Sequence, residues 1–311
     1  MRSLVVILMA ILSVFFGSIE MMAQQRAPVK FFMSLNAKEE AGGLSQPYGL
    51  FLNEHNERLI VSDTGKNRLL FFDARDDEFK FLEEFNAHGA MFHPVGVVQD
   101  NQGKLYVTER GKNGVTIYDR DTNSENVLVL GGISDTSLCI PTNLAMDMSG
   151  NLYVLEQRYK RILVFDPALR LKSQISIPGQ AFTGFSDMAV DKNGRIYALE
   201  TLTGKIYVFD PEGKLINKFG KLGTKPGDFD FPTSIALDPH GNIYVVDQHK
   251  HKVLVFNSQG VFQWEFGQFG WKEGSLYFPT YILIDSSNRV FIMERNINRI
   301  QIFAPIYRKT L

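Results

Sequence analysis

Two histidines and one aspartate stand close together in the segment VVDQHKHKVLVF, residues 245–256. Asp247, His249 and His251 fall within five residues of one another, and the chain has only six histidines. Imidazole nitrogens and carboxylate oxygens are ligands that zinc prefers. The segment therefore predicts a metal site, unless these positions have another role in the elements that carry them.

Those elements belong to a repeat. PTNLAMDMSGNLYVLEQRYKRILVFD (141–166) and PTSIALDPHGNIYVVDQHKHKVLVFN (232–257) are its clearest copies. Successive copies are spaced by 47, 47, 44, 47 and 47 residues, and they begin at Pro47, Pro94, Pro141, Phe185, Pro232 and Pro279. Such a period indicates a repeat architecture.

Each copy predicts a strand, a tight turn, a second strand, a loop and a third strand, because short β-branched and aromatic runs alternate with turn residues. The turn is Asp-x-x-Gly in four copies, for example Asp147–Gly150. Asp accepts backbone N–H groups two residues on, and Gly adopts the left-handed conformation. These turns lack the further oxygen ligands of a calcium loop, so we interpret them as structural.

A fourth strand follows the first five copies, as in VFQWEFG (261–267), whereas the sixth copy has none. VKFFMSL (29–35) is a spare strand ahead of the first copy. If it completes the last sheet, the ring closes and only short protected edges remain. We therefore predict an all-β fold, a six-bladed β-propeller of four-stranded antiparallel blades closed by an N-terminal strand.

The repeats resemble NHL repeats, a family named for a recurring Asn, His and Leu. The resemblance is carried by SDTGKNRLLFFD (62–73), FPTSIALDPHGNIYVVD (231–247) and the linker FGKLGTKPGDFDFP (219–232), and it extends from about Val29 to Phe303. The copy at Phe185 departs from the pattern, since it lacks the proline and has a shorter linker. The resemblance implies a propeller that binds its partner through one face.

The alignment of copies changes the interpretation of the two histidines. His251 occupies the position of Asn67, Asn113 and Asn298, where the family has His or Asn. His249 has no such explanation, because its equivalents are Gly65, Gly111, Arg158, Leu202 and Asn296. We expect His249 to alter the charge of its surface as the pH falls through about 6.5.

The loops between second and third strands should emerge on the same face as the linkers into the first strands, which we name the top face. Each of these loops begins with an acid: Asp63, Glu109, Glu156, Glu200, Asp247 and Glu294. A base follows five residues later in five copies: Arg68, Arg161, Lys205, Lys252 and Arg299. The spacing predicts an ion pair across the base of each such loop, worth about 0 to 1 kcal/mol where exposed.

The same loops hold twelve basic residues against six acids, in a chain whose net charge is -1. We therefore expect the top face to bind a protein or an anionic ligand such as a polysaccharide or a phosphate-bearing molecule. The candidate binding residues are Lys66, Arg110, Lys112, Arg158, Lys160, His249, Lys250, His251 and Arg295. We expect no nucleic acid there, because stacking aromatics are not interleaved with these bases.

The residues that begin the innermost strands should surround the mouth of the central tunnel. Its candidate ligand-binding residues are Asn143, Asp187, Ser234 and Tyr281. In gluconolactonase-type propellers such positions hold a divalent ion, and amidating lyases hold zinc with histidines from separate blades. The alternative function is therefore a metal-dependent hydrolase or lyase, with calcium or zinc held by Asn143 and Asp187. Our main expectation is a binding or scaffold module without catalytic residues, cofactor or metal.

The N-terminus predicts export. Arg2 precedes LVVILMAILSVFF (4–16), an apolar run of 13 residues that suits a secretory signal better than a membrane span. We predict a signal peptide over residues 1–23, with an uncleaved anchor as the alternative, a propeller over 24–305 and a tail over 306–311. The product would be a periplasmic or extracellular monomer, touching a membrane only through that segment. Cys139 is the single cysteine, so no intrachain disulfide forms.

Overall fold

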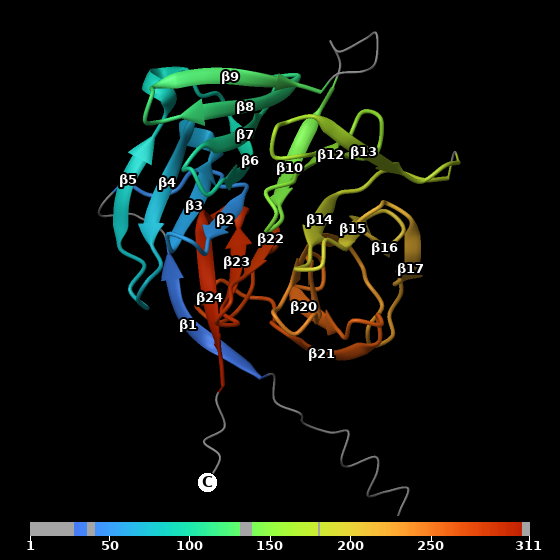
Figure 1. The fold of residues 1–311 in the computed structure, drawn as a ribbon. Coiled ribbons are helices and arrows are strands. Elements are labelled where there is room, and N and C mark those ends of the chain that lie inside the picture. Colours follow the sequence, from blue (N-terminus) through green and yellow to red (C-terminus); the bar gives the residue numbers. More distant parts are fainter. Residues whose placement is uncertain (1–27, 36–40, 131–138, 180, 307–311) are drawn as a thin grey trace, which may run out of the picture.

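The computed structural model describes residues 28–35, 41–130, 139–179 and 181–306, and it shows six antiparallel sheets of four strands each (Figure 1). The first strand of every sheet contacts the first strands of the two neighbouring sheets, from β2 through β6, β10, β14 and β18 to β22 and back to β2. This closed circle of inner strands makes the chain a six-bladed β-propeller, as the repeat predicted.

The blades follow the order of the copies. Blade 1 consists of β2 (Leu50–Asn53), β3 (Arg58–Asp63), β4 (Arg68–Asp73) and β5 (Phe81–Phe85). Blade 2 consists of β6 (Pro94–Gln99), β7 (Leu105–Glu109), β8 (Gly114–Asp119) and β9 (Ser124–Val129). Blade 3 consists of β10 (Pro141–Met146), β11 (Leu152–Glu156), β12 (Arg161–Phe165) and β13 (Leu171–Ser176).

The second half of the ring repeats this order. Blade 4 consists of β14 (Asp187–Val190), β15 (Ile196–Glu200), β16 (Lys205–Phe209) and β17 (Leu215–Phe219). Blade 5 consists of β18 (Pro232–Leu237), β19 (Ile243–Asp247), β20 (Lys252–Phe256) and β21 (Phe262–Phe266). Blade 6 consists of β22 (Tyr281–Ile284), β23 (Val290–Glu294), β24 (Arg299–Pro305) and β1 (Val29–Leu35).

The middle strands are almost continuously apolar because neighbouring blades cover both of their faces. The segment IYVVD of β19 is buried at every residue, and so is VFIME of β23. The outer strands alternate instead, as FLEEF of β5 does, because only one face is covered. The cores therefore lie between the blades, where packing fixes the direction of each inner strand.

The N-terminal strand closes the ring as predicted. β1 pairs antiparallel with β24, with Val29 opposite Pro305 and Leu35 opposite Ile300. Phe31 packs edge-on against Phe303 at a ring separation of 6.1 Å. The first and last parts of the described chain thus share one sheet, and β1 pairs with the edge of β24 that would otherwise be free.

The Asp-x-x-Gly turns form as predicted. The Asp147 carboxylate accepts the backbone N–H of Ser149 at 2.9 Å and that of Asn151 at 2.9 Å, and Gly150 has φ of 80°. Asp100, Asp191 and Asp238 accept equivalent N–H groups. One carboxylate oxygen is therefore occupied by the turn itself, which agrees with a structural role.

The loop acids of the top face have a larger role than the predicted exposed ion pairs. All six are buried, and each accepts a backbone N–H from the linker of its own blade. Asp247, for example, accepts the N–H groups of Asp230 at 2.7 Å and Phe231 at 3.1 Å. The acids therefore hold the linkers in place where each inner strand begins.

The predicted acid-to-base pairs form in blades 1, 3 and 6 only. Arg68 binds Asp63 at 2.8 Å, Arg161 binds Glu156 at 3.3 Å and Arg299 binds Glu294 at 2.6 Å. The predictions for the other two pairs are wrong. Lys205 donates to the Gly220 carbonyl at 2.7 Å, and Lys252 pairs with Glu265, because a lysine at this position reaches outward along its own blade.

The predicted signal peptide at 1–23 and nearly all of the predicted tail at 306–311 lie outside the described residues, as do residues 24–27 of the predicted propeller. Within the described part of the chain, no helix has the length and hydropathy needed to cross a membrane.

Replacing Asp247 by Asn should lower the free energy of unfolding by about 2 kcal/mol or more, because an amide N–H₂ would then face backbone N–H donors inside the protein. Urea denaturation monitored by circular dichroism measures this loss. The control is Asp230→Asn, whose exposed side chain should leave stability within about 0.5 kcal/mol of wild type. Equal midpoints for the two variants would contradict the assigned role of Asp247.

Candidate functional site at the tunnel mouth

The structure brings the four predicted tunnel-mouth residues together. Asp187, at the start of β14, accepts hydrogen bonds from the Ser234 hydroxyl at 2.6 Å and from the Asn143 side-chain amide. The Tyr281 hydroxyl lies 3.5 Å from Asn143 Oδ1. These side chains come from blades 3, 4, 5 and 6, so only closure of the ring makes them neighbours.

Asp187 is the ionisable centre of this group. Its carboxylate also accepts the backbone N–H groups of Ile235 at 2.9 Å and Met188 at 2.8 Å. Burial nevertheless raises the pKa of Asp187 to about 6, because desolvation disfavours the charged form more than the hydrogen bonds favour it. Burial, and then the charge of Asp187, raise the pKa of Tyr281.

A cavity of about 350 Å³ is lined by Asn143, Asp187 and Tyr281 of this group, with further residues from all six blades, whereas Ser234 is fully buried behind Asp187 and does not line it. Its lining is rich in uncharged hydroxyl and amide groups: Tyr48, Thr142, Asn143, Gln157, Ser186, Thr201, Thr233, Thr280 and Tyr281. Asp187 and Arg295 are its charged residues. The Thr233 hydroxyl is buried and has no hydrogen-bond partner among the described residues. This size and polarity suit a small polar ligand.

Two arginines flank one tyrosine at the rim of the cavity. The guanidinium carbon of Arg295 lies 5.1 Å from the centre of the Tyr48 ring, and that of Arg110 lies 5.6 Å from it. Neither guanidinium has an ion-pair partner within the described part of the chain. Burial, followed by the charge of Arg110, lowers the pKa of Arg295. Two like charges thus lie near one ring, and neither is ion-paired with a described residue.

The predicted binding lysines are mostly engaged within the protein. The ammonium groups of Lys66, Lys160 and Lys250 donate to linker carbonyls, and that of Lys112 binds Glu109 at 2.8 Å. Arg158 is exposed and makes no side-chain hydrogen bond or ion pair with any described residue. Their role in binding stays a prediction, but the arginines are the bases whose charge is left for a ligand.

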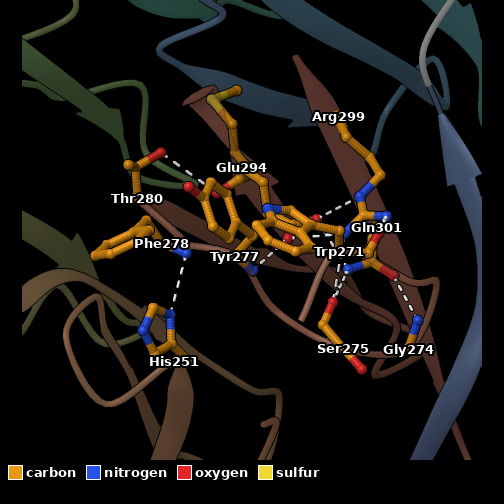
Figure 2. A network of polar contacts seen from close by, with 11 residues as sticks. His251, Trp271, Gly274, Ser275, Tyr277, Phe278, Thr280, Glu294, Arg299 and Gln301 are labelled. Carbon is orange, nitrogen blue, oxygen red and sulfur yellow. Dashed lines mark hydrogen bonds and ion pairs between the residues drawn. The ribbon is translucent and has the colours of Figure 1, made fainter. Parts of the chain in front are cut away.

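The two histidines have separate surroundings. His249 stacks on Phe231, with ring centres 4.6 Å apart and an interplanar angle of 19°, and Phe231 lines the cavity. His251 Nδ1 accepts the backbone N–H of Phe278 at 3.2 Å (Figure 2). His249 therefore packs against a residue of the cavity wall, whereas His251 links blade 5 to blade 6.

The link made by His251 recurs at two other blade junctions. Asn67 accepts the N–H of His93 at 2.8 Å, and Asn298 accepts that of Gln46 at 2.7 Å. Asn67, His251 and Asn298 all have φ between 53° and 56°, the left-handed conformation that Asn tolerates well. The position shared by Asn and His in the repeats therefore provides an acceptor between blades.

The tunnel-mouth residues do not fit a divalent metal ion. Among the described residues Asp187 is the one carboxylate that lines the cavity, and both of its oxygens already accept hydrogen bonds from the protein. No group of three or more His, Cys, Asp or Glu side chains able to hold a metal occurs in residues 28–35, 41–130, 139–179 and 181–306. Calcium would require several further oxygen ligands, and zinc at least one more protein ligand.

Sequence reasoning found the tunnel-mouth residues but missed two features of the top face. It did not relate Arg110 and Arg295 to Tyr48, because the three residues are far apart in the chain. It also missed the aromatic side chains of the linkers, which include Phe231 and Tyr277. Comparing the linkers of successive copies would have shown Tyr277 as a departure from the repeat, because the preceding linker has Asp230 at the equivalent position.

Comparisons with known proteins agree with the fold. The model of the DUF5128 six-bladed β-propeller family matches residues 188–271. The chain is 30% identical over 129 residues to the brain tumor protein of Drosophila melanogaster. That match covers 40% of this chain and only 12% of the fly protein, so the two share no more than a segment.

Solved propellers share the architecture at low sequence identity. A gluconolactonase from Xanthomonas campestris has a TM-score of 0.66 at 15% identity, over 90% of this chain and 96% of its own. Virginiamycin B lyase from Staphylococcus aureus has a TM-score of 0.60 at 13% identity, over 88% of this chain and 98% of its own. At this identity the likeness establishes the fold and leaves the activity open.

Replacing His251 by Asn should remove part of the pH dependence of stability. Burial, and then the charge of His249, lower the pKa of His251, and only a ring with an unprotonated Nδ1 can accept the Phe278 N–H. Since the folded state binds this proton more weakly than the unfolded state, the stabilisation is complete above the ordinary pKa of about 6.5 and is lost as pH falls through the folded-state pKa.

Urea denaturation at pH 5 and pH 8 measures the effect. His251→Asn should lose less stability than wild type between these pH values, because the Asn67 and Asn298 junctions show that an amide oxygen can serve as the acceptor. The control His240→Asn alters an exposed histidine in a hairpin turn and should behave as wild type. An unchanged pH dependence in His251→Asn would refute the role of the histidine.

Proposed function

We propose that this chain is an exported NHL-type propeller that binds a hydroxyl-rich ligand carrying an anionic group at its tunnel mouth. The observation that carries the proposal is the pair Arg110 and Arg295, whose guanidinium groups lie over Tyr48 of the cavity wall without an ion-pair partner among the described residues. The protein acts as a binding module, and the top face around the cavity is its interaction surface.

An anionic group suits the rim for an electrostatic reason. Burial, and then repulsion from Arg110, lower the pKa of Arg295, and an anion bound beside the two guanidinium groups would offset that repulsion. A carboxylate or phosphate can accept charge-assisted hydrogen bonds from both arginines.

Hydroxyl groups on the ligand suit the cavity below the rim. Most polar lining residues can both donate and accept hydrogen bonds, as a hydroxyl on the ligand can. Phe231, stacked on His249, gives the cavity wall an apolar face.

Two features support the family and location parts of the proposal. The Asn and His acceptors at three blade junctions occupy the positions from which the NHL resemblance was drawn. The apolar segment at residues 4–16 has the length of a secretory signal. Export would bring the top face into contact with extracellular or periplasmic ligands, and a protein with an acidic surface is the alternative partner.

A metal-dependent hydrolase or lyase is the second candidate function, since both solved relatives named above are enzymes by their descriptions. Asn143 and Asp187 would have to hold the ion. Their mutual hydrogen bond, and the N–H donors that occupy Asp187, argue against that role.

Replacing Arg110 and Arg295 by Gln should weaken the binding of an anionic sugar by about tenfold or more, because each charge-assisted hydrogen bond contributes roughly 1.5–3 kcal/mol. Isothermal titration with galacturonate, and with inorganic phosphate as the simplest anion, measures the change. Arg170→Gln removes an exposed arginine paired with Asp166 and is the matched control. Equal affinities in the double variant and the control would refute an anion site at the rim.

Elemental analysis separates the two candidate functions. Protein purified without chelator should contain no divalent ion in a stoichiometric amount, because the donor set at the tunnel mouth is incomplete. A calcium or zinc ion in a one-to-one ratio, lost in Asp187→Ala, would support the enzyme instead.

A further inference from the structure

An exposed group of aromatic rings lies on the linker between blades 5 and 6. Phe269 and Trp271 are 58% and 64% exposed, and Tyr277 is half-buried beside them. The Trp271 and Tyr277 ring centres are 5.4 Å apart, and Phe269 lies 5.9 Å from each. Figure 2 shows Trp271 and Tyr277 side by side. We name Phe269, Trp271 and Tyr277 the aromatic platform.

The preceding linker has the same backbone structure and provides an internal comparison. Residues 219–232 and 266–279 align without gaps as FGKLGTKPGDFDFP and FGQFGWKEGSLYFP. Leu222 bridges Phe229 in the first, as Phe269 bridges Leu276 in the second. Equivalent backbone hydrogen bonds join Phe229 to Lys221 at 2.9 Å and Leu276 to Gln268 at 2.8 Å. The two linkers therefore fold in the same way.

The platform is not needed for this fold. The linker at 219–232 has Leu222, Thr224 and Asp230 where the platform has Phe269, Trp271 and Tyr277. Large exposed aromatic side chains lower solubility and gain little from their own packing, so they call for another explanation. Binding provides one, since Trp and Tyr dominate the energetics of recognition surfaces.

Two side chains of β24 also form hydrogen bonds with the backbone of the linker that carries the platform. Arg299 donates to the Trp271 carbonyl at 2.8 Å while its other donors bind Glu294. Gln301 donates to the Ser275 carbonyl at 2.7 Å and accepts the Gly274 N–H at 2.7 Å (Figure 2). A surface fixed in this way binds without ordering a loop, which lowers the entropic cost of association.

The surroundings of the platform indicate its ligand chemistry. The large exposed hydrophobic side chains of this linker are both aromatic, and the neighbours Gln268, Lys272 and Glu273 are polar and exposed. A sugar ring fits this pattern, because its C–H face carries partial positive charge that favours the negative face of an aromatic ring, while its hydroxyls meet polar groups at the rim. The same linker continues through Phe278 to Thr280 and Tyr281 in the cavity.

We propose that the aromatic platform is a second saccharide subsite, and that the ligand is an acidic oligosaccharide running from the tunnel mouth to the outer rim between blades 5 and 6. The part of this proposal that concerns the ligand end bound by Arg110 and Arg295 rests on the proposed function. The platform binds neighbouring sugar units by stacking and lengthens the recognised ligand beyond one residue.

The test uses the full chain and four probes: galacturonate, tetragalacturonate, neutral cellotetraose and a polyglutamate peptide. Trp264 and Trp271 are the two tryptophans, so Trp264→Phe leaves Trp271 as the sole tryptophan, whose selectively excited fluorescence reports platform occupancy. Tetragalacturonate should change this emission and bind about tenfold more tightly than galacturonate, as expected for added stacking contacts.

The double variant Trp271→Thr, Tyr277→Asp carries at these two positions the residues of the linker at 219–232, so it should fold normally. It should lose the tenfold gain for tetragalacturonate and keep the affinity for galacturonate, whereas the control Leu222→Ala should behave as wild type. Unchanged tetragalacturonate binding in the double variant would overturn the proposal. Platform-dependent binding of polyglutamate, with none of the three saccharides affecting Trp271, would overturn it in favour of a protein partner.

The same measurements distinguish a wrong anion site at the tunnel mouth from a wrong platform. If galacturonate does not bind but cellotetraose or tetragalacturonate perturbs Trp271, the anion site is wrong and the saccharide platform is supported. If galacturonate binds and no saccharide perturbs Trp271, the tunnel mouth stands and the platform proposal is overturned.

Discussion

The hydrogen bonds between a buried acid and the linker of its own blade are the interactions on which the rest of this propeller depends. Each acid ends the second strand, and each linker must leave the outer edge of one blade and enter the centre of the next. A linker crossing the top face has backbone N–H groups with no strand partner, and the carboxylate satisfies them at a fixed point. The inner strands then begin in register around the axis, which places their first side chains at the tunnel mouth.

The structure of the linkers also determines which basic side chains remain free to bind a ligand. Carbonyl groups of the same linkers attract ammonium groups, so Lys66, Lys160 and Lys250 are engaged in holding loops. Arg68, Arg161 and Arg299 neutralise buried acids. Arg110 and Arg295 lie over the Tyr48 ring instead, and neither forms an ion pair with a described residue. A surface that looks broadly basic by composition therefore presents its available charge mainly at the tunnel mouth.

Because the blades repeat, a residue of one blade can be compared with the equivalent residues of the others. Asn67 and Asn298 explain His251, and the linker at 219–232 explains which parts of the linker at 266–279 are structural. What remains after such a comparison is the best guide to function in a repeat protein, since every blade shares the requirements of folding. The requirements shared by all blades do not explain five residues, which all belong to loops or linkers of the top face: Arg110, His249, Trp271, Tyr277 and Arg295.

The sequence by itself determined the period, the strand order, the hairpin turns and the closing strand, because these follow from local patterns of hydrophobicity and turn chemistry repeated six times. It also predicted that Asn143, Asp187, Ser234 and Tyr281 surround the tunnel mouth. The tertiary structure alone decided that the acids are buried, that two predicted ion pairs do not form, and that Arg110 and Arg295 share Tyr48. The physical reason is that burial and pairing depend on distances across the ring, and these are fixed only when blades far apart in the chain pack together.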